Sequence, residues 1–353
     1  MKSTNFYFAG ILSLALAFSS CTQDEDIHDE STQSFETPST TVTNARSLGI
    51  TGSSADVTTT TTGGTVLMGG GPDVDRAMQW MIDKSGGGDF VVIRATGTNA
   101  YNDYIYGLGT VNSVETLLID SRSLANDAAI ADKIRKAEAL FIAGGDQYDY
   151  VSYWKGTKVE DAINYLRNVK QVPIGGTSAG CAIMGATYFD AANGTVRSSE
   201  ALRNPYRTEV SLQRDNFIDN PFLDNTITDT HYNDPDRRGR HVTFLARMNQ
   251  DWGINGKGIG VDEETAVCID NSGKAVVFGN GYAFFLQQNG AGPERCAPRK
   301  SLDWYRNRRA VEVYKVLGNN SGANYFWLDR WNGGSGGSWQ YYYADRGRLQ
   351  ISY

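Results

Sequence analysis

A glycine–x–serine–x–glycine motif is the first part of the sequence that could do chemistry, with Gly176, Ser178 and Gly180 at its fixed positions. A short apolar run, 172–174, precedes the motif, and helix-compatible residues, 182–184, follow it. This is the sequence form of a nucleophile elbow, a strand-to-helix turn too tight for side chains on either flank of the serine. Such a turn lifts the hydroxyl above the sheet edge, in front of the positive end of the next helix. The motif predicts a nucleophilic Ser178; the alternative is a glycine-rich loop with an ordinary serine.

A serine nucleophile needs a base to accept its proton, and the chain has only three histidines. His28 lies in the polar N-terminal segment. His231 follows the strand-like residues 227–230, whereas His241 lies in a helical stretch, where we expect it to pack or to face solvent. A histidine at a strand end can reach a serine at a strand end, so His231 is the predicted base.

The acid that orients the imidazole is not fixed by spacing alone. More than a hundred residues follow His231, whereas ordinary α/β-hydrolases place their histidine near the C-terminus, which argues against a lipase or esterase of that type. The candidates between the serine and the histidine are Asp190, Glu200, Glu209, Asp215, Asp219, Asp224 and Asp229.

The elements around the motif predict a doubly wound α/β fold with a mostly parallel sheet. Buried strands without polar alternation are separated by helical patterns, as in sheets covered on both faces. The expected strands are 65–68, 90–93, one within 114–119, 140–142 and 172–174, and the expected helices are 76–84, 128–139, 159–169 and 242–248. In such sheets the site lies at the carboxyl ends of the strands, where Gly69–Gly71, Gly144–Gln147 and Ser178 fall.

Composition excludes several classes of function. The net charge of -7 argues against nucleic acid as the main partner. Three histidines without paired spacing predict no metal or cofactor site, and Gly69–Gly71 lacks the lysine and hydroxyl residue of a phosphate loop. Cys181 is expected to be a buried small hydrophobe, and a disulfide between Cys268 and Cys296 stays open.

The N-terminus has the features of a secretory signal. Lys2 precedes an apolar stretch from Phe6 to Phe18, and a small-residue pair then leads to Cys21. This pattern resembles a bacterial lipobox, which predicts a lipid on Cys21 and a location in the cell envelope; the alternative is a soluble secreted protein. The acidic run 24–26 fits either a surface-export signal or a solvated linker.

The expected domain organisation has four parts. These are a signal peptide (1–20), a disordered linker (21–62), a catalytic α/β domain (63–300) and a C-terminal β extension (301–353) that includes the aromatic runs 325–327 and 340–343.

Five motifs in order give a resemblance to a known family. They are Leu67–Gly71, Phe141–Gln147, Gly176–Met184, Asp229–Tyr232 and Gly258–Ala266. Together they resemble cyanophycinase and its relatives, the serine peptidases of family S51 that include the aspartyl dipeptidases. The resemblance covers about residues 65–279 and implies a class I glutamine amidotransferase-like fold.

The resemblance also implies roles for single residues. Ser178 and His231 match the nucleophile and the base, and the acid, some twenty residues past the serine, points to Glu200, with Asp190 as the second choice. Asp146 and Gln147 match a substrate-facing loop. Arg238 and Arg240 match a basic run after the histidine, which here is lengthened by 233–237.

The expected activity is hydrolysis of a peptide or isopeptide bond of the β-aspartyl type by a Ser–Glu–His triad. The backbone N–H groups of Ala179 and of Gly144 or Gly145 would hold the oxyanion. The alternatives are a surface-tethered binding protein without turnover and an esterase with the same triad. Relatives are often dimers, so a homodimer stays open.

Overall fold

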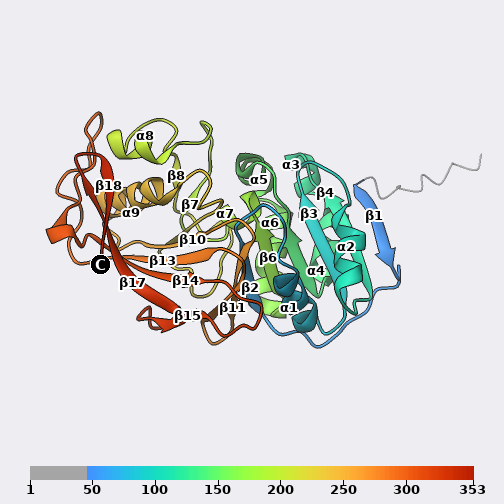
Figure 1. Cartoon of the computed structure of the whole chain (residues 1–353). Coiled ribbons are helices and arrows are strands. Elements are labelled where there is room, and N and C mark those ends of the chain that lie inside the picture. The colour runs from blue at the N-terminus through green and yellow to red at the C-terminus, as the bar shows by residue number, and fades with distance from the viewer. Residues whose placement is uncertain (1–45) are drawn as a thin grey trace, which may run out of the picture. The chain divides into compact units, whose positions relative to one another are not determined.

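A ten-stranded sheet forms the centre of the fold in the computed structural model, which describes residues 46–353 (Figure 1). The strand order is β1-β4-β3-β5-β6-β2-β11-β12-β15-β16. The pairs from β4 to β2 are parallel, and the pairs on both outer sides are antiparallel. The strands are β1 (Ser47–Gly52), β2 (Gly64–Met68), β3 (Asp89–Arg94), β4 (Ser113–Leu118), β5 (Ala139–Ile142), β6 (Pro173–Thr177), β11 (Thr265–Asp270), β12 (Lys274–Gly279), β15 (Tyr325–Trp327) and β16 (Gly334–Ser335).

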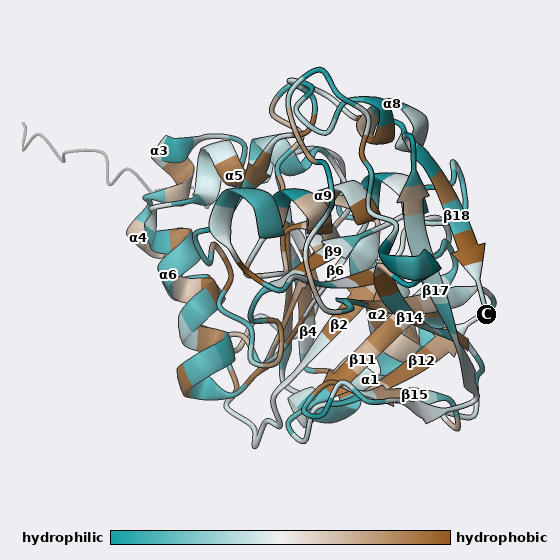
Figure 2. Cartoon of the chain, turned by 90° about the vertical axis from the view of Figure 1, so that its left-hand side faces the viewer, coloured by the Kyte–Doolittle hydropathy of each residue, from teal (hydrophilic) through white to brown (hydrophobic). Residues whose placement is uncertain are grey.

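Helices cover both faces of the parallel strands, as the alternation along β2 shows. Val66 and Met68 belong to the hydrophobic cluster of α1 and α2, while Leu67 belongs to the cluster of α4, α5 and α6. Successive side chains of a strand point to opposite faces, so each face buries its own core. The helices are α1 (Asp75–Ser85), α2 (Tyr101–Leu108), α3 (Arg122–Ala125), α4 (Ala128–Lys136), α5 (Gln147–Trp154), α6 (Lys158–Tyr165), the π-turn η1 (Leu166–Lys170) and α7 (Ala179–Ala182). Figure 2 shows the hydrophobic residues along β11 and β12 and a largely hydrophilic outer side of α6.

A second, six-stranded sheet has the order β18-β17-β14-β13-β10-β9 and is parallel only between β9 and β10. Helices α8 and α9 pack with this sheet around a third hydrophobic cluster. The elements are β9 (Thr226–Asp229), β10 (Lys257–Val261), β13 (Tyr282–Gln288), β14 (Val311–Leu317), β17 (Gly337–Asp345), β18 (Arg348–Ser352), α8 (Ser198–Arg203), α9 (Arg238–Trp252) and the short 3-10 turn η2 (Arg306–Arg308), while β7 (Tyr188–Phe189) pairs with β8 (Leu212–Gln213).

The predicted α/β class is confirmed, and the five expected strands of the parallel region are present as β2 to β6. Helix α4 ends at Lys136, three residues earlier than expected, because Ala139 already belongs to β5. The residues after 300 do not form a layer of their own. They complete both sheets, and Asn44–Tyr353 is one compact unit.

Two expectations, one about the linker before the α/β domain and one about the cysteines, differ from the structure. Residues 47–52, assigned to the disordered linker, form β1, which pairs antiparallel with β4. Backbone hydrogen bonds to β4 hold this edge strand. Because it contains few large apolar residues, the sequence showed no hydrophobic pattern that would predict a strand here. Cys181, Cys268 and Cys296 are all buried free thiols, so the Cys268–Cys296 disulfide is absent. The signal peptide and Cys21 lie outside the described residues.

Candidate active site

Ser178 stands at the turn between β6 and α7, as the motif predicts. Its backbone angles are φ 52° and ψ -116°, a strained conformation for a residue with a side chain. The two glycines are required by close approach. A Cβ on Gly176 would lie 2.5 Å from the carbonyl carbon of Gly180, and one on Gly180 would lie 2.2 Å from the carbonyl oxygen of Ile142. The elbow therefore depends on both glycines.

His231 lies beside this serine, although 53 residues separate them in the sequence. Ser178 Oγ is 2.8 Å from His231 Nε2. The histidine follows β9, has φ 46°, and its backbone N–H donates to the carbonyl of Gly69 at 2.7 Å. Gly70 makes room for the ring, because a Cβ there would lie 2.5 Å from both Cε1 and Nε2 of the imidazole. The end of β2 thus forms the wall that holds His231.

The carboxylate on the other side of the imidazole belongs to Glu263. Its Oε1 is 2.5 Å from His231 Nδ1, so the protonated Nδ1 donates to it. Glu263 lies in the turn between β10 and β11, and its backbone N–H donates to the side-chain oxygen of Asn233 at 3.0 Å. Ser178, His231 and Glu263 therefore form a continuous chain of two hydrogen bonds.

The prediction of Glu200 as the acid, with Asp190 as second choice, does not agree with this geometry. The Glu200 carboxylate accepts from the backbone N–H of Arg197 at the N-terminus of α8. Asp190 is buried and accepts from Ala192, Ser211 and Gln213. Both carboxylates are occupied by local structure and neither contacts the imidazole.

A cavity of about 360 Å³ opens beside the serine. Gly145 and Ala179 line it, and a Cβ on Gly144 would be 3.6 Å from Ser178 Cβ, so the residues expected to hold an oxyanion lie near the serine. The complete lining is Gly145, Asp146, Gln147, Ser178, Ala179, Ala191, Gly194, Thr195, Thr230, His231, Arg237 and Arg240.

Of the two arginines in the predicted basic run, Arg240 lines this cavity and Arg238 does not. Arg240 forms a buried ion pair with Asp229, its Nε lying 2.9 Å from Oδ2. Burial raises the pKa of the Asp229 carboxyl, but the charge and hydrogen bonds of Arg240 outweigh this, and the pKa is lowered overall. Arg238 does not line the cavity, because its guanidinium binds both oxygens of Asp236.

Arg237 is the cavity residue that the sequence reasoning missed. Its Nη1 donates to the carbonyl of Thr230 at 3.0 Å, and its buried Nε has no partner among the described residues. Burial, with the nearby charge of Arg240, lowers its pKa to about 10, so Arg237 keeps its charge at neutral pH. Among the described residues no carboxylate lies within 4 Å of the Arg237 guanidinium, although the charges of Asp229 and Glu263 act on it from farther away and favour its charged form.

The other predicted residues have local partners. Asp146 caps α5 by accepting from the Tyr148 N–H at 2.9 Å, and Gln147 Nε2 donates to the Phe189 carbonyl at 3.4 Å, so both side chains line the cavity from its edge. His241 is fully buried, as a packing residue, between Tyr232 and the Ile227 carbonyl. Burial raises the pKa of the Cys181 thiol, which makes it a poor nucleophile.

Within residues 46–353, no group of three or more histidine, cysteine or acidic side chains could hold a metal ion. No helix in the same range is long and apolar enough to cross a membrane.

The fold and the site define an α/β protein in which a serine, a histidine and a glutamate are linked by hydrogen bonds. Comparison with known proteins finds similarity to a family of peptidases. The sequence pattern of peptidase family S51 matches residues 108–277. Cyanophycinase of Trichormus variabilis is 26% identical over 168 residues, which are 48% of this chain and 51% of that protein. Cyanophycinase of Thermosynechococcus vestitus is 26% identical over 181 residues, 51% of each chain.

The chain is therefore similar to cyanophycinases over its central part. It spans about half the length of the curated relatives that it matches. Among solved structures, a peptidase from an acI-B1 Actinobacterium aligns with a TM-score of 0.46 and 16% identity, over 64% of this chain and 90% of that one.

Proposed function

We propose that this protein is a serine-type peptidase that hydrolyses peptide or isopeptide bonds. The observation that carries the proposal is the chain of hydrogen bonds from Ser178 through His231 to Glu263 at a strained elbow. A serine, a base and an orienting acid in this relation are the parts that acyl transfer requires. The similarity to family S51 and to cyanophycinases supports the same reading.

In the proposed reaction, Ser178 Oγ attacks the carbonyl carbon while His231 Nε2 accepts the hydroxyl proton. Glu263 holds the imidazole in the tautomer with its proton on Nδ1 and stabilises the imidazolium that forms. The backbone N–H groups of Ala179 and of Gly144 or Gly145 face the developing oxyanion, and donors of this kind are each worth about 3 kcal/mol by precedent. The imidazolium then protonates the leaving amine, and water hydrolyses the acyl-enzyme.

The charge of the cavity favours a substrate with an acidic group beside the scissile bond. Arg240 is neutralised by Asp229, whereas the buried Nε of Arg237 has no partner in the described chain. A carboxylate near the scissile carbonyl would pair with the Arg237 guanidinium that lines the cavity, since hydrogen bonds between ionised groups are the stronger ones. We therefore assign β-aspartyl peptides as the substrate class, which agrees with the family resemblance.

Parallel assays test this function and its alternatives. β-Aspartyl dipeptides, α-aspartyl dipeptides and p-nitrophenyl acetate are incubated with the wild type and with Ser178→Ala. The proposal expects cleavage of the β-aspartyl bond that Ser178→Ala abolishes without loss of folding. Turnover of the ester alone would favour an esterase, and no turnover of any of them would favour a binding protein.

Two further parts of the prediction are also proposals. We assign the parallel core to the class I glutamine amidotransferase-like type, with its extra strands as an extension. We also propose that a lipid on Cys21 anchors the chain in the bacterial envelope. Metabolic labelling with a fatty-acid analogue tests the anchor: Cys21→Ser should abolish incorporation, and labelling that persists would contradict it.

A further inference from the structure

One end of the molecule carries a concentration of positive charge that the proposed reaction does not use. The segments 294–309 and 345–348 contain eight arginines and lysines but only three carboxylates, whereas the whole chain has 33 basic and 40 acidic residues. The excess is therefore local and opposite in sign to the net charge of -7.

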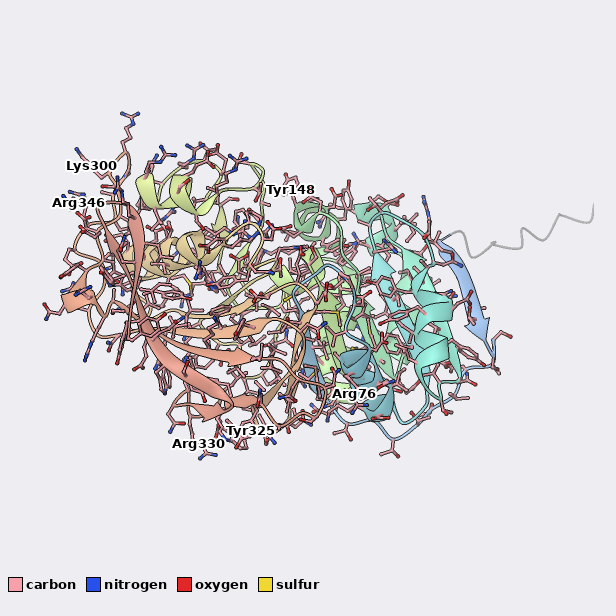
Figure 3. The ribbon with its side chains drawn as sticks, viewed as in Figure 1. Arg76, Tyr148, Lys300, Tyr325, Arg330 and Arg346 are labelled. Atoms are coloured by element: carbon pink, nitrogen blue, oxygen red, sulfur yellow. The ribbon has the colours of Figure 1, made fainter. Side chains whose placement is uncertain are left out.

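Backbone contacts bring these two segments together. Trp304 and Ala344 exchange two hydrogen bonds, of 2.8 and 3.0 Å, and the Gly347 N–H donates to the Leu302 carbonyl at 2.9 Å. The hydroxyl of Ser352, at the end of β18, donates to the Arg308 carbonyl at 2.6 Å. Figure 3 shows Lys300 and Arg346 projecting close together from this end of the fold.

The three carboxylates of these segments are already paired. Asp303 binds Arg295, Glu294 binds Arg306, and Asp345 binds Arg346. Five exposed cations then have no carboxylate within 4 Å in residues 46–353, and we name this set the basic end: Arg299, Lys300, Arg308, Arg309 and Arg348.

Tyrosines lie between and beside these cations. Arg308 and Arg309 lie over the rings of Tyr343 and Tyr341, at 5.8 and 5.0 Å. Tyr305 and Tyr353 are 44% and 91% exposed. Cores of protein–protein interfaces contain arginine and tyrosine but are depleted of charged residues as a whole, whereas this surface carries five cations without a carboxylate partner in the described chain. Exposed tyrosine beside such a net positive charge fits the headgroup layer of a membrane, because the ring is amphipathic and the cations meet lipid phosphates.

We propose that the basic end is a docking surface for an anionic phospholipid bilayer. The contact is peripheral: phosphate groups neutralise the five cations, and the exposed rings of Tyr305 and Tyr353 lie at headgroup depth. Because the attraction acts between exposed charges, salt weakens it over a Debye length of about 10 Å at 0.1 M. The basic end is defined without reference to the lipid predicted at Cys21.

Vesicle co-sedimentation with residues 44–353 tests the proposal. This stretch is one compact unit that contains all three hydrophobic clusters and the whole candidate site, and it lacks both the signal segment and Cys21. Vesicles are made of phosphatidylcholine alone or with phosphatidylglycerol. The expected result is binding only to the anionic vesicles at low salt, with release in concentrated sodium chloride.

A matched pair of triple variants separates the effect of the basic end on binding from the effect of the protein's net charge. The triple variant Arg299→Glu/Lys300→Glu/Arg348→Glu should bind about tenfold or more weakly, because each cation near an anionic surface contributes to attraction. The control, Arg76→Glu/Lys158→Glu/Arg330→Glu, changes the charge equally at exposed positions outside the basic end and should bind like the wild type.

Three outcomes would overturn the proposal. They are equal binding to neutral vesicles, equal loss in both triple variants, and binding to duplex DNA at the same salt without binding to vesicles. Thermal unfolding of each variant shows that it is folded, and cleavage of the β-aspartyl substrate is expected to be unchanged in both.

Discussion

Glu263 Oε1 lies 2.5 Å from Nδ1 of His231, and the glutamate comes 32 residues after the histidine in the chain. The order of the three groups is therefore serine, histidine, glutamate. Three different strand ends supply them: β6 ends before Ser178, β9 before His231, and β10 before Glu263. This relation decides which carboxylate is expected to matter for turnover.

Glu263→Gln should reduce kcat by roughly 100- to 10,000-fold, because the amide can hold the wrong imidazole tautomer and cannot stabilise the imidazolium. Glu200→Gln is the matched control, and it should leave kcat within about twofold, since Glu200 only accepts a backbone hydrogen bond at the N-terminus of α8. Initial rates on a saturating β-aspartyl substrate measure both. A large loss in Glu200→Gln with little change in Glu263→Gln would reverse the assignment.

Arg237→Met should raise KM for a β-aspartyl dipeptide by roughly 10- to 100-fold and change kcat much less, because a hydrogen bond to a charged group is worth about 1.5–3 kcal/mol. Arg238→Met removes a neighbouring charge whose guanidinium is already held by Asp236, outside the cavity. Its KM should stay close to that of the wild type. Equal effects of the two substitutions would show that only the general charge of the loop matters.

Gly70→Ala should lower kcat/KM by about 100-fold, since the new Cβ would lie 2.5 Å from the imidazole and push it away from Ser178. The φ of +100° adds backbone strain. Gly107→Ala is the control: this helical glycine has nothing within 4 Å of a built Cβ, and the change should stabilise α2 by roughly 0.5–1 kcal/mol. Circular dichroism checks folding, and an unchanged kcat/KM in folded Gly70→Ala would refute the role of this wall.

His241 predicts a pH dependence of stability away from the site. Burial lowers its pKa to about 4 from an ordinary value near 6.5. His241 binds a proton below about pH 6.5 in the unfolded chain but only near pH 4 in the folded chain. The folded state is therefore fully stable above pH 6.5 and loses about 3 kcal/mol as the pH drops to 4. The free energy of unfolding, measured with urea at each pH, should fall less steeply with decreasing pH in His241→Gln than in the wild type. Equal pH dependence in the two proteins would contradict the account.

The elbow and the histidine were predictable because each follows a short strand-like run, 172–174 before the elbow and 227–230 before His231. Ser178 and His231 could be paired from spacing and from the small number of histidines, but the expectation that both lie at the same sheet edge was wrong, because β6 and β9 belong to different sheets. Glu263 could not be chosen in the same way, because the family resemblance pointed to an acid about twenty residues after the serine, whereas Glu263 follows His231 in the chain. The motif Gly258–Ala266 was visible in the sequence, and its carboxylates held the missing signal.

Two parts of the fold could not be predicted from the sequence, and in both cases the reason is physical. β1 is held at a sheet edge by backbone hydrogen bonds, which leave little trace in the side-chain pattern. The strands after residue 300 read as a separate extension because sequence shows alternation but not partners, and β14 pairs with β13 from the preceding segment. Pairing across long separations is a tertiary property that local pattern does not contain.

The rate at which a fluorophosphonate labels Ser178, with the site identified by peptide mass spectrometry, tests the proposed hydrogen-bonded chain most directly. The account predicts rapid labelling of Ser178 in the wild type and in Glu200→Gln, labelling slowed at least 100-fold in His231→Gln and Glu263→Gln, and none in Ser178→Ala. Labelling of another residue, or equal rates in Glu263→Gln and the wild type, would contradict it.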